Sequence, residues 1–381
     1  MLNAAIPSFD ERIHQITQAR LAVMGDGKSP PGLLADPWIE RSWQRCMASG
    51  KRPEQGVSFE VLAPQAARRT EEANHVLVQA ARPVLEKLGQ AIASTRYFAI
   101  LTNAHGVVVD VNGPIDRHDR RADVITRIGV DLSEQSVGTT AIGAALNELK
   151  PVWLHRGEHF FNANSSYSCA GAPLFGPDGR CVGMLDVTGI DAVERPELKH
   201  LVLQSARNIE NALMPRSPKG LMVRLNWSDQ SLGEDADGMV CIDRDGYFTG
   251  ANQAARQMVP ALQPGNPATV HCSDLFAMHP DLLFNAARGD AMGYPQRIEV
   301  PLWSGLRLHA LPIGQGADPS VELHGSKSSP APAIPLKEIE TALIRKAVSD
   351  AHGNVMKAAR TLGISRATVY RRLGGKPKQA A

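Results

Sequence analysis

Near the C-terminus, residues 353–375 combine a cationic helix face with the spacing of two short crossing helices. Val355 and Ala359 lie four residues apart on one apolar helix face, and the small side chain at 359 lets a second helix cross closely. Gly363 can adopt the left-handed conformation that ends a helix, and Ser365 can cap the helix that follows. This pattern predicts a helix-turn-helix.

The outward side chains of the second helix are those that suit the DNA major groove. Arginine can bind the acceptors of guanine, alanine or threonine can contact a thymine methyl, and hydroxyls and further cations can bind phosphates. We expect these residues to contact DNA: Ser365, Arg366, Ala367, Thr368, Tyr370, Arg371, Arg372 and, from the preceding helix, Lys357. The alternative is a solvated helical hairpin with a basic face, which the coincidence of several features disfavours.

The positive charge of the chain is concentrated at the same end. Residues 336–381 contain ten Lys/Arg against three Asp/Glu, a net charge of +7, although the whole chain carries only +2. Residues 1–335 contain 31 Lys/Arg against 36 Asp/Glu and therefore carry −5. This asymmetry indicates a nucleic-acid-binding segment attached to a body that does not bind nucleic acid.

The composition indicates an ordinary soluble protein with two or three domains, because 43% of the 381 residues are hydrophobic and 21% are charged. No apolar run approaches the roughly 18 residues of a membrane span, and the N-terminus lacks a charged-then-apolar leader. We therefore expect a cytoplasmic protein with no membrane partner. The cysteines form no CxxC pair, so we expect reduced thiols and neither a metal site nor a cofactor. They are Cys46, Cys169, Cys181, Cys241 and Cys272.

Residues 22–29, Ala-Val-Met-Gly-Asp-Gly-Lys-Ser, fit a relaxed phosphate-loop pattern. A phosphate loop joins a buried strand to a helix whose N-terminus faces the phosphates. This stretch instead follows a helical pattern and runs into Pro30 and Pro31, which oppose the start of a helix there. We interpret residues 1–70 as a helical region without a nucleotide site.

Residues 71–214 show the pattern of one α+β domain, with amphipathic helices at both ends. The run RYFAILTNAHGVVVDV turns back at Ala-His-Gly, and GAPLFGPDGRCVGMLDVTG turns back at Pro-Asp-Gly. We expect a connector at 215–233, a second α+β domain at 234–313 and a flexible linker at 314–335, which is rich in Gly, Ser and Pro. An all-α helix-turn-helix domain, residues 336–375, completes an α+β multidomain architecture.

The first α+β domain contains the candidate ligand-binding residues. Those that we expect to line an effector pocket are Trp153, His155, Phe161, Tyr167 and Cys169. Aromatic residues at such positions more often belong to the core. His155 and His159 could bind a metal ion, but Glu158 is the only other candidate ligand that clusters with them. This incomplete set of ligands favours a structural role for both histidines. Cys169 and Cys181 flank a hairpin and could lie near each other, although nothing marks either as a reactive thiolate.

These segments carry family resemblances. LKEIETALIRKAVSDA followed by GNVMKAARTLGISRATVYRRL resembles the Fis-type domain that closes many sigma-54-dependent bacterial activators, which implies a dimer. The run WIERSWQRC resembles regulators of the acetoin-catabolism-activator type, and GTTAIGAAL, EHFF and CAGAPLFGPDGRCVGMLDVTG resemble their GAF sensor domain. The run DADGMVCIDRDGYFTGANQAARQMV is similar to the start of a PAS domain. We therefore expect a GAF-like and a PAS-like domain before the helix-turn-helix.

The sequence departs from those activators at one place. They carry an ATPase domain between the sensor region and the Fis-type domain, whereas this chain has only the linker at 314–335. We find no strand-embedded phosphate loop, no acidic Walker B strand and no GAFTGA loop of the kind that grips sigma-54. We therefore expect no ATPase activity from this chain.

We expect a ligand-responsive, sequence-specific DNA-binding transcription regulator. It would bind an inverted repeat of double-stranded DNA as a homodimer, with an unknown small-molecule effector and with RNA polymerase or a sigma-54 activator as a further partner. Two alternatives are a regulatory partner of a full-length sigma-54 activator and a non-specific Fis-like DNA-bending protein. An enzyme is disfavoured, because we find no nucleophile elbow, paired acid motif or metal cluster.

Overall fold

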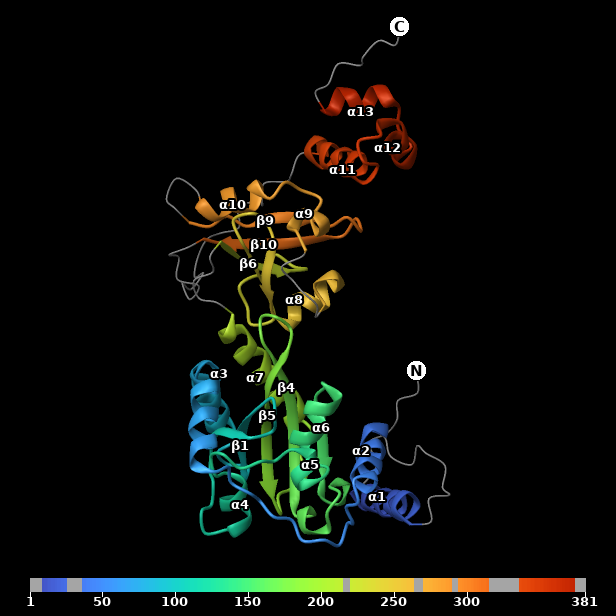
Figure 1. Cartoon of the computed structure of the whole chain (residues 1–381). Helices are drawn as coiled ribbons and strands as arrows, with labels where there is room; N and C mark the ends of the chain where they lie inside the picture. The colour runs from blue at the N-terminus through green and yellow to red at the C-terminus, as the bar shows by residue number, and fades with distance from the viewer. Residues whose placement is uncertain are drawn as a thin grey trace. The chain divides into compact units, whose positions relative to one another are not determined.

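The computed structural model describes residues 9–25, 36–214, 220–263, 270–289, 294–314 and 336–373. The chain divides into two units, Met1–Gly176 with Arg180–Leu213, and Pro177–Gly179 with Met214–Ala381. Each unit contains one antiparallel sheet, and three helices follow the sheet of the second unit (Figure 1). Within the described ranges, no helix is long and apolar enough to cross a membrane.

The first unit is built on a five-stranded antiparallel sheet in the order β2-β1-β5-β4-β3. Its strands are β1 (Tyr97–Asn103), β2 (Val108–Asn112), β3 (Val152–His155), β4 (Tyr167–Phe175) and β5 (Cys181–Ile190). The two expected hairpins are confirmed as β1–β2 and β4–β5. In the second hairpin Cys169 lies opposite Thr188 and Gly171 opposite Asp186. Since residues two apart on a strand share a face, Cys169, Thr188 and Asp186 project from the same side of the sheet.

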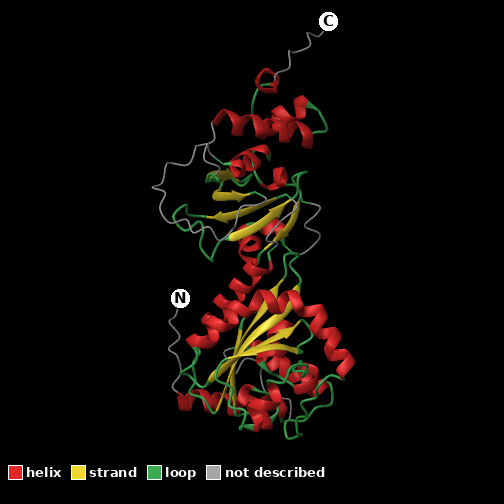
Figure 2. Ribbon diagram, turned by 90° about the vertical axis from the view of Figure 1, so that its left-hand side faces the viewer, coloured by secondary structure: helices red, strands yellow, loops and turns green. Residues whose placement is uncertain are grey.

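Helices cover both faces of this sheet (Figure 2). On one face, α3 (Pro64–Ala91) and α7 (Leu198–Leu213) pack on a core that contains Leu85, Val187 and Ile209. On the other face lie α4 (Arg120–Ile125), α5 (Glu134–Val137) and α6 (Ala141–Glu148), with a core that contains Ile100 and Val137. Helix α3 begins before residue 71, the boundary expected from sequence.

Two further helices, α1 (Phe9–Met24) and α2 (Pro37–Ala48), form a separate apolar cluster in the first unit. They pack against the segment after β3, which contains the short turns η1 (Arg156–Glu158) and η2 (Asn162–Asn164). Trp43 and Phe160 are fully buried in this cluster. Residues 22–24 of the phosphate-loop-like stretch belong to α1, and residues 26–29 lie outside the described residues.

The second unit contains another five-stranded antiparallel sheet, in the order β8-β7-β6-β10-β9. Its strands are β6 (Leu221–Asn226), β7 (Gly238–Ile242), β8 (Phe248–Ala251), β9 (Ile298–Pro301) and β10 (Arg307–Ile313). Its helices are α8 (Gln253–Met258), η3 (Pro260–Leu262), α9 (Cys272–Leu275) and α10 (Asp281–Arg288). Residues of these helices pack with one face of the sheet around Phe248 and Phe276, whose rings meet edge to face.

One expectation about this region is wrong. Residues 215–233 are predicted from sequence to be a connector, but residues 221–226 form β6, the central strand of the second sheet. Leu221, Val223 and Leu225 are buried in its core, between β7 and β10. The second domain therefore includes residues upstream of 234. The linker expected at 314–335 lies, apart from residue 314, outside the described residues.

The C-terminal helices are α11 (Leu336–Asp350), α12 (Val355–Leu362) and α13 (Arg366–Leu373). Their small core consists of Ile344, Ala359 and Val369, which are 1%, 4% and 0% exposed. Gly363 ends α12 in the left-handed region, with φ +65°, as the sequence predicts. Two short helices joined by this turn give the predicted helix-turn-helix.

Candidate nucleic-acid interface and sensor cavity

Helix α13 is oriented by one buried side chain and by its cap. Val369 packs inward with Ile344 and Ala359. The Ser365 Oγ accepts a hydrogen bond from the backbone N–H of Thr368 at 3.1 Å, which satisfies a free donor of the first turn. Because Val369 faces the core, the opposite side of the helix faces solvent.

The structure places the expected DNA-contacting residues on or beside this solvent side. Ser365, Arg366, Ala367 and Arg371 are exposed, as is Lys357 on α12. Thr368, Tyr370 and Arg372 are partly buried, and the Thr368 hydroxyl is 2.9 Å from Ser365 Oγ. Neither α12 nor α13 contains an acidic residue. The exposed side of α13 therefore carries positive charge and no negative charge.

The first unit contains a small cavity on the α6 face of its sheet, with a volume of about 30 Å³. Its walls are mostly apolar and come from β1, β4, β5, α4, α5 and α6 and from neighbouring loops. The lining residues are Phe59, Ile100, Ile125, Leu132, Val137, Thr140, Ala141, Ile142, His159, Asn164, Tyr167, Cys169, Asp186 and Thr188. By the same measure a water molecule needs about 10–15 Å³, so the cavity holds about two waters.

Four polar side chains of the lining contact one another, and we call Asp186, Thr188, Cys169 and His159 the polar pole. The Thr188 hydroxyl donates to Asp186 Oδ2 and lies 3.3 Å from Cys169 Sγ. Cys169 Sγ is 3.6 Å from His159 Nε2, and His159 Nδ1 is 2.9 Å from the Arg156 carbonyl oxygen. Since a carbonyl only accepts, we assign the ring proton to Nδ1, which leaves Nε2 as an acceptor.

Burial sets the protonation of the polar pole. It raises the pKa of Asp186 to about 7, against the opposing hydrogen bond from Thr188. It lowers the pKa of His159 to about 4 and raises the pKa of the Cys169 thiol well above its usual value. At pH 7 the imidazole and the thiol are therefore neutral, and neither offers a positive charge to balance an ionised Asp186.

The N-terminal helices hold the segment that carries His159. The buried Glu158 carboxylate accepts from Arg12 Nη2 at 2.9 and 3.0 Å and from the His155 backbone N–H at 2.6 Å. Trp43 Nε1 donates to the Glu158 carbonyl oxygen at 2.8 Å. Burial raises the pKa of Glu158 to about 7, although the Arg12 charge opposes this shift. One wall of the cavity thus depends on contacts from outside the sheet domain.

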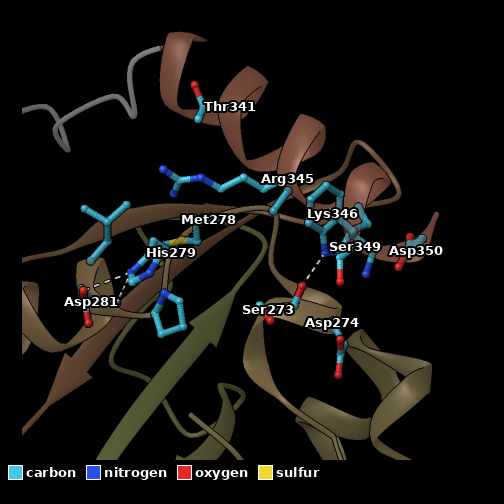
Figure 3. A pocket seen from close by; sticks show the side chains of 14 residues that line it. Ser273, Asp274, Met278, His279, Asp281, Thr341, Arg345, Lys346, Ser349 and Asp350 are labelled. Atoms are coloured by element: carbon cyan, nitrogen blue, oxygen red, sulfur yellow. Dashed lines mark hydrogen bonds and ion pairs between the residues drawn. The ribbon is translucent and has the colours of Figure 1, made fainter. Parts of the chain in front are cut away.

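A larger groove of about 720 Å³ lies in the second unit (Figure 3). Near it Trp303 Nε1 donates to the Ser273 carbonyl oxygen at 2.8 Å, and His279 Nδ1 lies 3.1 Å from Asp281 Oδ2. Asp274, His279 and Asp281 are exposed. Because these groups are exposed to solvent, we assign no ligand to this groove.

Comparison with protein families gives two matches. The family described as "MimR, N-terminal domain" matches residues 15–211, which is more than half of the chain. The chain belongs to the MimR N-terminal domain family. The family described as "Bacterial regulatory protein, Fis family" matches residues 335–374, the region of α11 to α13. The first match covers the cavity and the N-terminal helices, so we call residues 15–211 the MimR-type domain.

The chain is also similar to individual proteins. The acetoin catabolism regulatory protein of Cupriavidus necator is 27% identical over 300 residues, 74% of this chain and 43% of that protein. The acetoin dehydrogenase operon transcriptional activator AcoR of Bacillus subtilis is 30% identical over 183 residues, 47% of this chain and 30% of that protein. The chain thus spans less than half the length of either relative. A crystal structure of the E. coli DhaR(N)-DhaL complex is similar over 73% of this chain and 99% of that chain, with 15% identity and a TM-score of 0.44.

Only two of the five residues expected to line a pocket border this cavity of the MimR-type domain. Tyr167 and Cys169 do. Trp153 belongs to the core on the α3 face, and the centroids of the stacked Trp153 and His155 rings are 6.4 Å apart. Both residues point away from the cavity, because they alternate along β3 with Val152 and Leu154, which face the cavity side. Phe161 packs instead in the cluster formed with α1 and α2.

Most of the polar pole is absent from the residues predicted from sequence to line a pocket. These include Cys169 but not Asp186 or Thr188, and His159 is predicted only as a possible metal ligand with a structural role favoured. The available signal was a pair of polar residues two apart within the otherwise apolar strand CVGMLDVTGI, which places both on one face. Cys181 lies opposite Phe175, at the far end of the hairpin from Cys169, so the two cysteines are not neighbours. No group of three or more His, Cys, Asp or Glu suited to a metal occurs among the described residues.

Proposed function

We propose that the chain is a ligand-responsive, dimeric, sequence-specific DNA-binding transcription regulator. The observation that carries this proposal is the exposed cationic side of α13, in a segment that matches the Fis family. Arg366 and Arg371 would read or hold the major groove, Ser365, Thr368 and Tyr370 would support them with hydroxyls, and Ala367 would face a thymine methyl. Arg372 and Lys357 would contribute phosphate contacts.

The DNA target would be an inverted repeat. A dimer that presents two copies of α13 would bind half-sites about 34 Å apart, one turn of the duplex. We place the dimer contact on α11, as the resemblance to Fis-type domains implies. The side chains of residues 336–340, 342 and 343 lie outside those described, so the proposal rests on the family match.

The effector would bind in the cavity of the MimR-type domain, which we take to be a GAF-like sensor. Its mostly apolar lining with a few convergent polar groups is the composition typical of ligand sites. Relatives are named for acetoin catabolism and for a propane 2-monooxygenase operon. We infer that the effector of this chain is likewise a small metabolite. The second sheet domain would act as a PAS-like element between the sensor and the helix-turn-helix.

Regulation would follow from a shift in population between two dimer arrangements. An effector can change the DNA affinity only by as much as it prefers one arrangement over the other. We propose that the chain does this without its own ATPase, because no phosphate loop of the required context and no GAFTGA loop occurs in the sequence. It would then act on RNA polymerase or together with a sigma-54 activator.

The decisive experiment selects duplexes from random DNA with the full chain and then measures binding of the selected duplex. Arg366→Ala/Arg371→Ala should abolish retention of that duplex at moderate salt. Arg68→Ala/Arg69→Ala removes the same charge from the exposed side of α3 and should bind like the wild type. Equal affinity for selected and scrambled DNA would favour the non-specific DNA-bending alternative and contradict the proposal.

A further inference from the structure

The turn of the β4–β5 hairpin belongs to a different unit from its strands. Strands β4 and β5 lie in the first sheet, whereas Pro177–Gly179 is part of the second unit. The Gly176 N–H donates to the Arg180 carbonyl oxygen at 2.9 Å, so the hairpin is paired up to the residues that flank the turn. The second unit thus includes three residues that lie, in sequence, inside the MimR-type domain.

The carbonyl oxygen of Pro177 accepts two hydrogen bonds within the second unit. The backbone N–H of Ala251, the last residue of β8, donates to it at 2.9 Å, and Arg256 Nη2 of α8 donates to it at 2.7 Å. Arg256 Nη1 donates to the Leu262 carbonyl oxygen in η3. One guanidinium therefore joins the turn to the helical segment that follows β8.

Burial makes this guanidinium dependent on its acceptors. Arg256 is 0% exposed. An arginine side chain keeps its charge, so a buried guanidinium that has lost its hydration is costly unless carbonyl or carboxylate oxygens bind it. A displacement of the turn would remove the Pro177 carbonyl from this set. The position of α8 therefore depends on the position of the turn.

Two glycines allow the turn to approach this closely. Gly179 has a φ of +80°, and a Cβ added there would lie 2.8 Å from Arg256 Cζ. On β8, a Cβ added at Gly250 would lie 3.1 Å from Pro177 Cβ. Side chains at either position would push against the turn or its anchor, so glycine is required by close backbone approach.

The same hairpin carries residues of the sensor cavity. Cys169 on β4 and Asp186 on β5 line that cavity, and the two strands are paired from Tyr167 to Phe175. Glu210 of α7, which is 5% exposed, accepts from the Phe175 N–H at 3.0 Å and holds β4 just before the turn. A shift of the paired strands at the cavity would therefore also shift the turn.

We propose that the Pro177–Gly179 turn couples the two units, with Arg256 as the residue that holds it, so that a change in the first sheet alters β8 and α8. The regulatory meaning of this coupling rests on the proposed function, which takes the first unit as the sensor. Coupling between two sites is reciprocal. A disturbance of α8 must therefore reach β4 and β5, and a disturbance of the turn must reach α8.

Hydrogen-exchange mass spectrometry of the full chain, without DNA or effector, tests both directions. Arg256→Met removes a donor to the Pro177 carbonyl and should raise amide exchange in β4 and β5 by about tenfold, as expected for the loss of one hydrogen bond to a charged group. Gly179→Ala strains the turn and displaces the guanidinium. It should raise amide exchange in α8 by a similar factor.

Two control variants change the second unit without touching the turn or its anchor. Arg297→Met removes another arginine that binds backbone carbonyls, those of Asp229 at 2.7 Å and Leu232 at 3.2 Å. It should leave exchange in β4 and β5 at the wild-type rate. Gly305→Ala places a Cβ in the β9–β10 turn at φ +87°, where no atom lies within 4 Å of it. It should leave exchange in α8 unchanged.

Wild-type exchange in β4 and β5 of Arg256→Met, wild-type exchange in α8 of Gly179→Ala, or an equal rise in the matching control would overturn the proposal. A rise spread evenly over the chain, including α1 and α2, would also overturn it, because it reports general destabilisation. The measurement contains no DNA. A failure of DNA binding therefore leaves its result standing, and a failure here leaves the DNA-binding proposal intact.

Discussion

Arg20 holds the backbone of His159, with its Nη1 2.6 Å from the His159 carbonyl oxygen. The same nitrogen donates to the Gly157 carbonyl at 2.8 Å, and Nη2 donates to the Phe160 carbonyl at 3.0 Å. On its other side, the His159 side chain lines the cavity of the MimR-type domain. Helix α1, which precedes the sheet, therefore fixes the position of a residue of the polar pole.

Loss of the Arg20 hydrogen bonds should destabilise the MimR-type domain. Arg20→Met keeps most of the aliphatic stem but leaves three backbone carbonyl acceptors without their charged donor. We expect the free energy of unfolding to fall by about 2–3 kcal/mol. Chemical denaturation of both proteins measures the difference. Gln18→Ala, on an exposed position of the same helix, should change it little. Equal stabilities of Arg20→Met and wild type would contradict this role of Arg20.

The free energy of unfolding should change with pH because Asp186 binds a proton more tightly in the folded state. Burial raises the pKa of Asp186 to about 7 from 3.8. Between about pH 4 and pH 7, the folded state therefore keeps a proton on Asp186 that the unfolded state has lost. Stability contributed by this group is therefore complete below about pH 4 and falls as pH rises towards 7. Asp186→Asn cannot ionise, so its stability should not fall over this pH range. The free energy of unfolding of the variant should exceed that of wild type by about 2–4 kcal/mol at pH 8 and equal it at pH 4.

Denaturation of wild type and Asp186→Asn across this pH range measures the effect. Glu158, whose pKa burial also raises to about 7, adds a contribution of the same sign that both proteins share. Glu71→Gln removes an exposed carboxylate from α3 and should follow the wild-type curve. Parallel curves for Asp186→Asn and wild type would show that Asp186 is ionised in the folded protein.

The turn between α12 and α13 should depend on Gly363. Its φ of +65° strains any residue with a Cβ, and no atom lies within 4 Å of a Cβ added there, so the cost is conformational. We expect Gly363→Ala to destabilise the helix-turn-helix by about 1 kcal/mol and Gly363→Asn by less. The melting of the helical signal and the DNA affinity should both follow this order. A fully tolerated alanine would contradict the assigned turn.

The helix-turn-helix could be predicted from sequence because its determinants are local. Ala359, Gly363, Ser365 and Val369 lie within eleven residues, and each has a separate structural role that its side chain reveals. The hairpins of the first sheet were predictable for the same reason, since Gly106 and Gly179 mark their turns and adopt positive φ. Local chemistry therefore fixed these elements.

The cavity could not be predicted in the same way. Which face of β3 meets the cavity depends on its pairing with β4 and on the helices above, so Trp153 and His155 were assigned to the wrong side. His159 enters the site only because α1 and α2 hold its segment, a contact across more than 130 residues. The strand β6 was missed because its identity comes from β7 and β10 on either side.

The central claim is that a small molecule in the MimR-type domain controls DNA binding by α13. A fluorescence anisotropy titration of a selected operator duplex with the full chain, with and without candidate small metabolites, tests it most directly. We predict an affinity change of about fivefold or more on adding a metabolite that binds the MimR-type domain, and no specific binding by Arg366→Ala/Arg371→Ala under either condition. An operator affinity that no bound metabolite changes, or a double variant that binds like the wild type, would contradict the account.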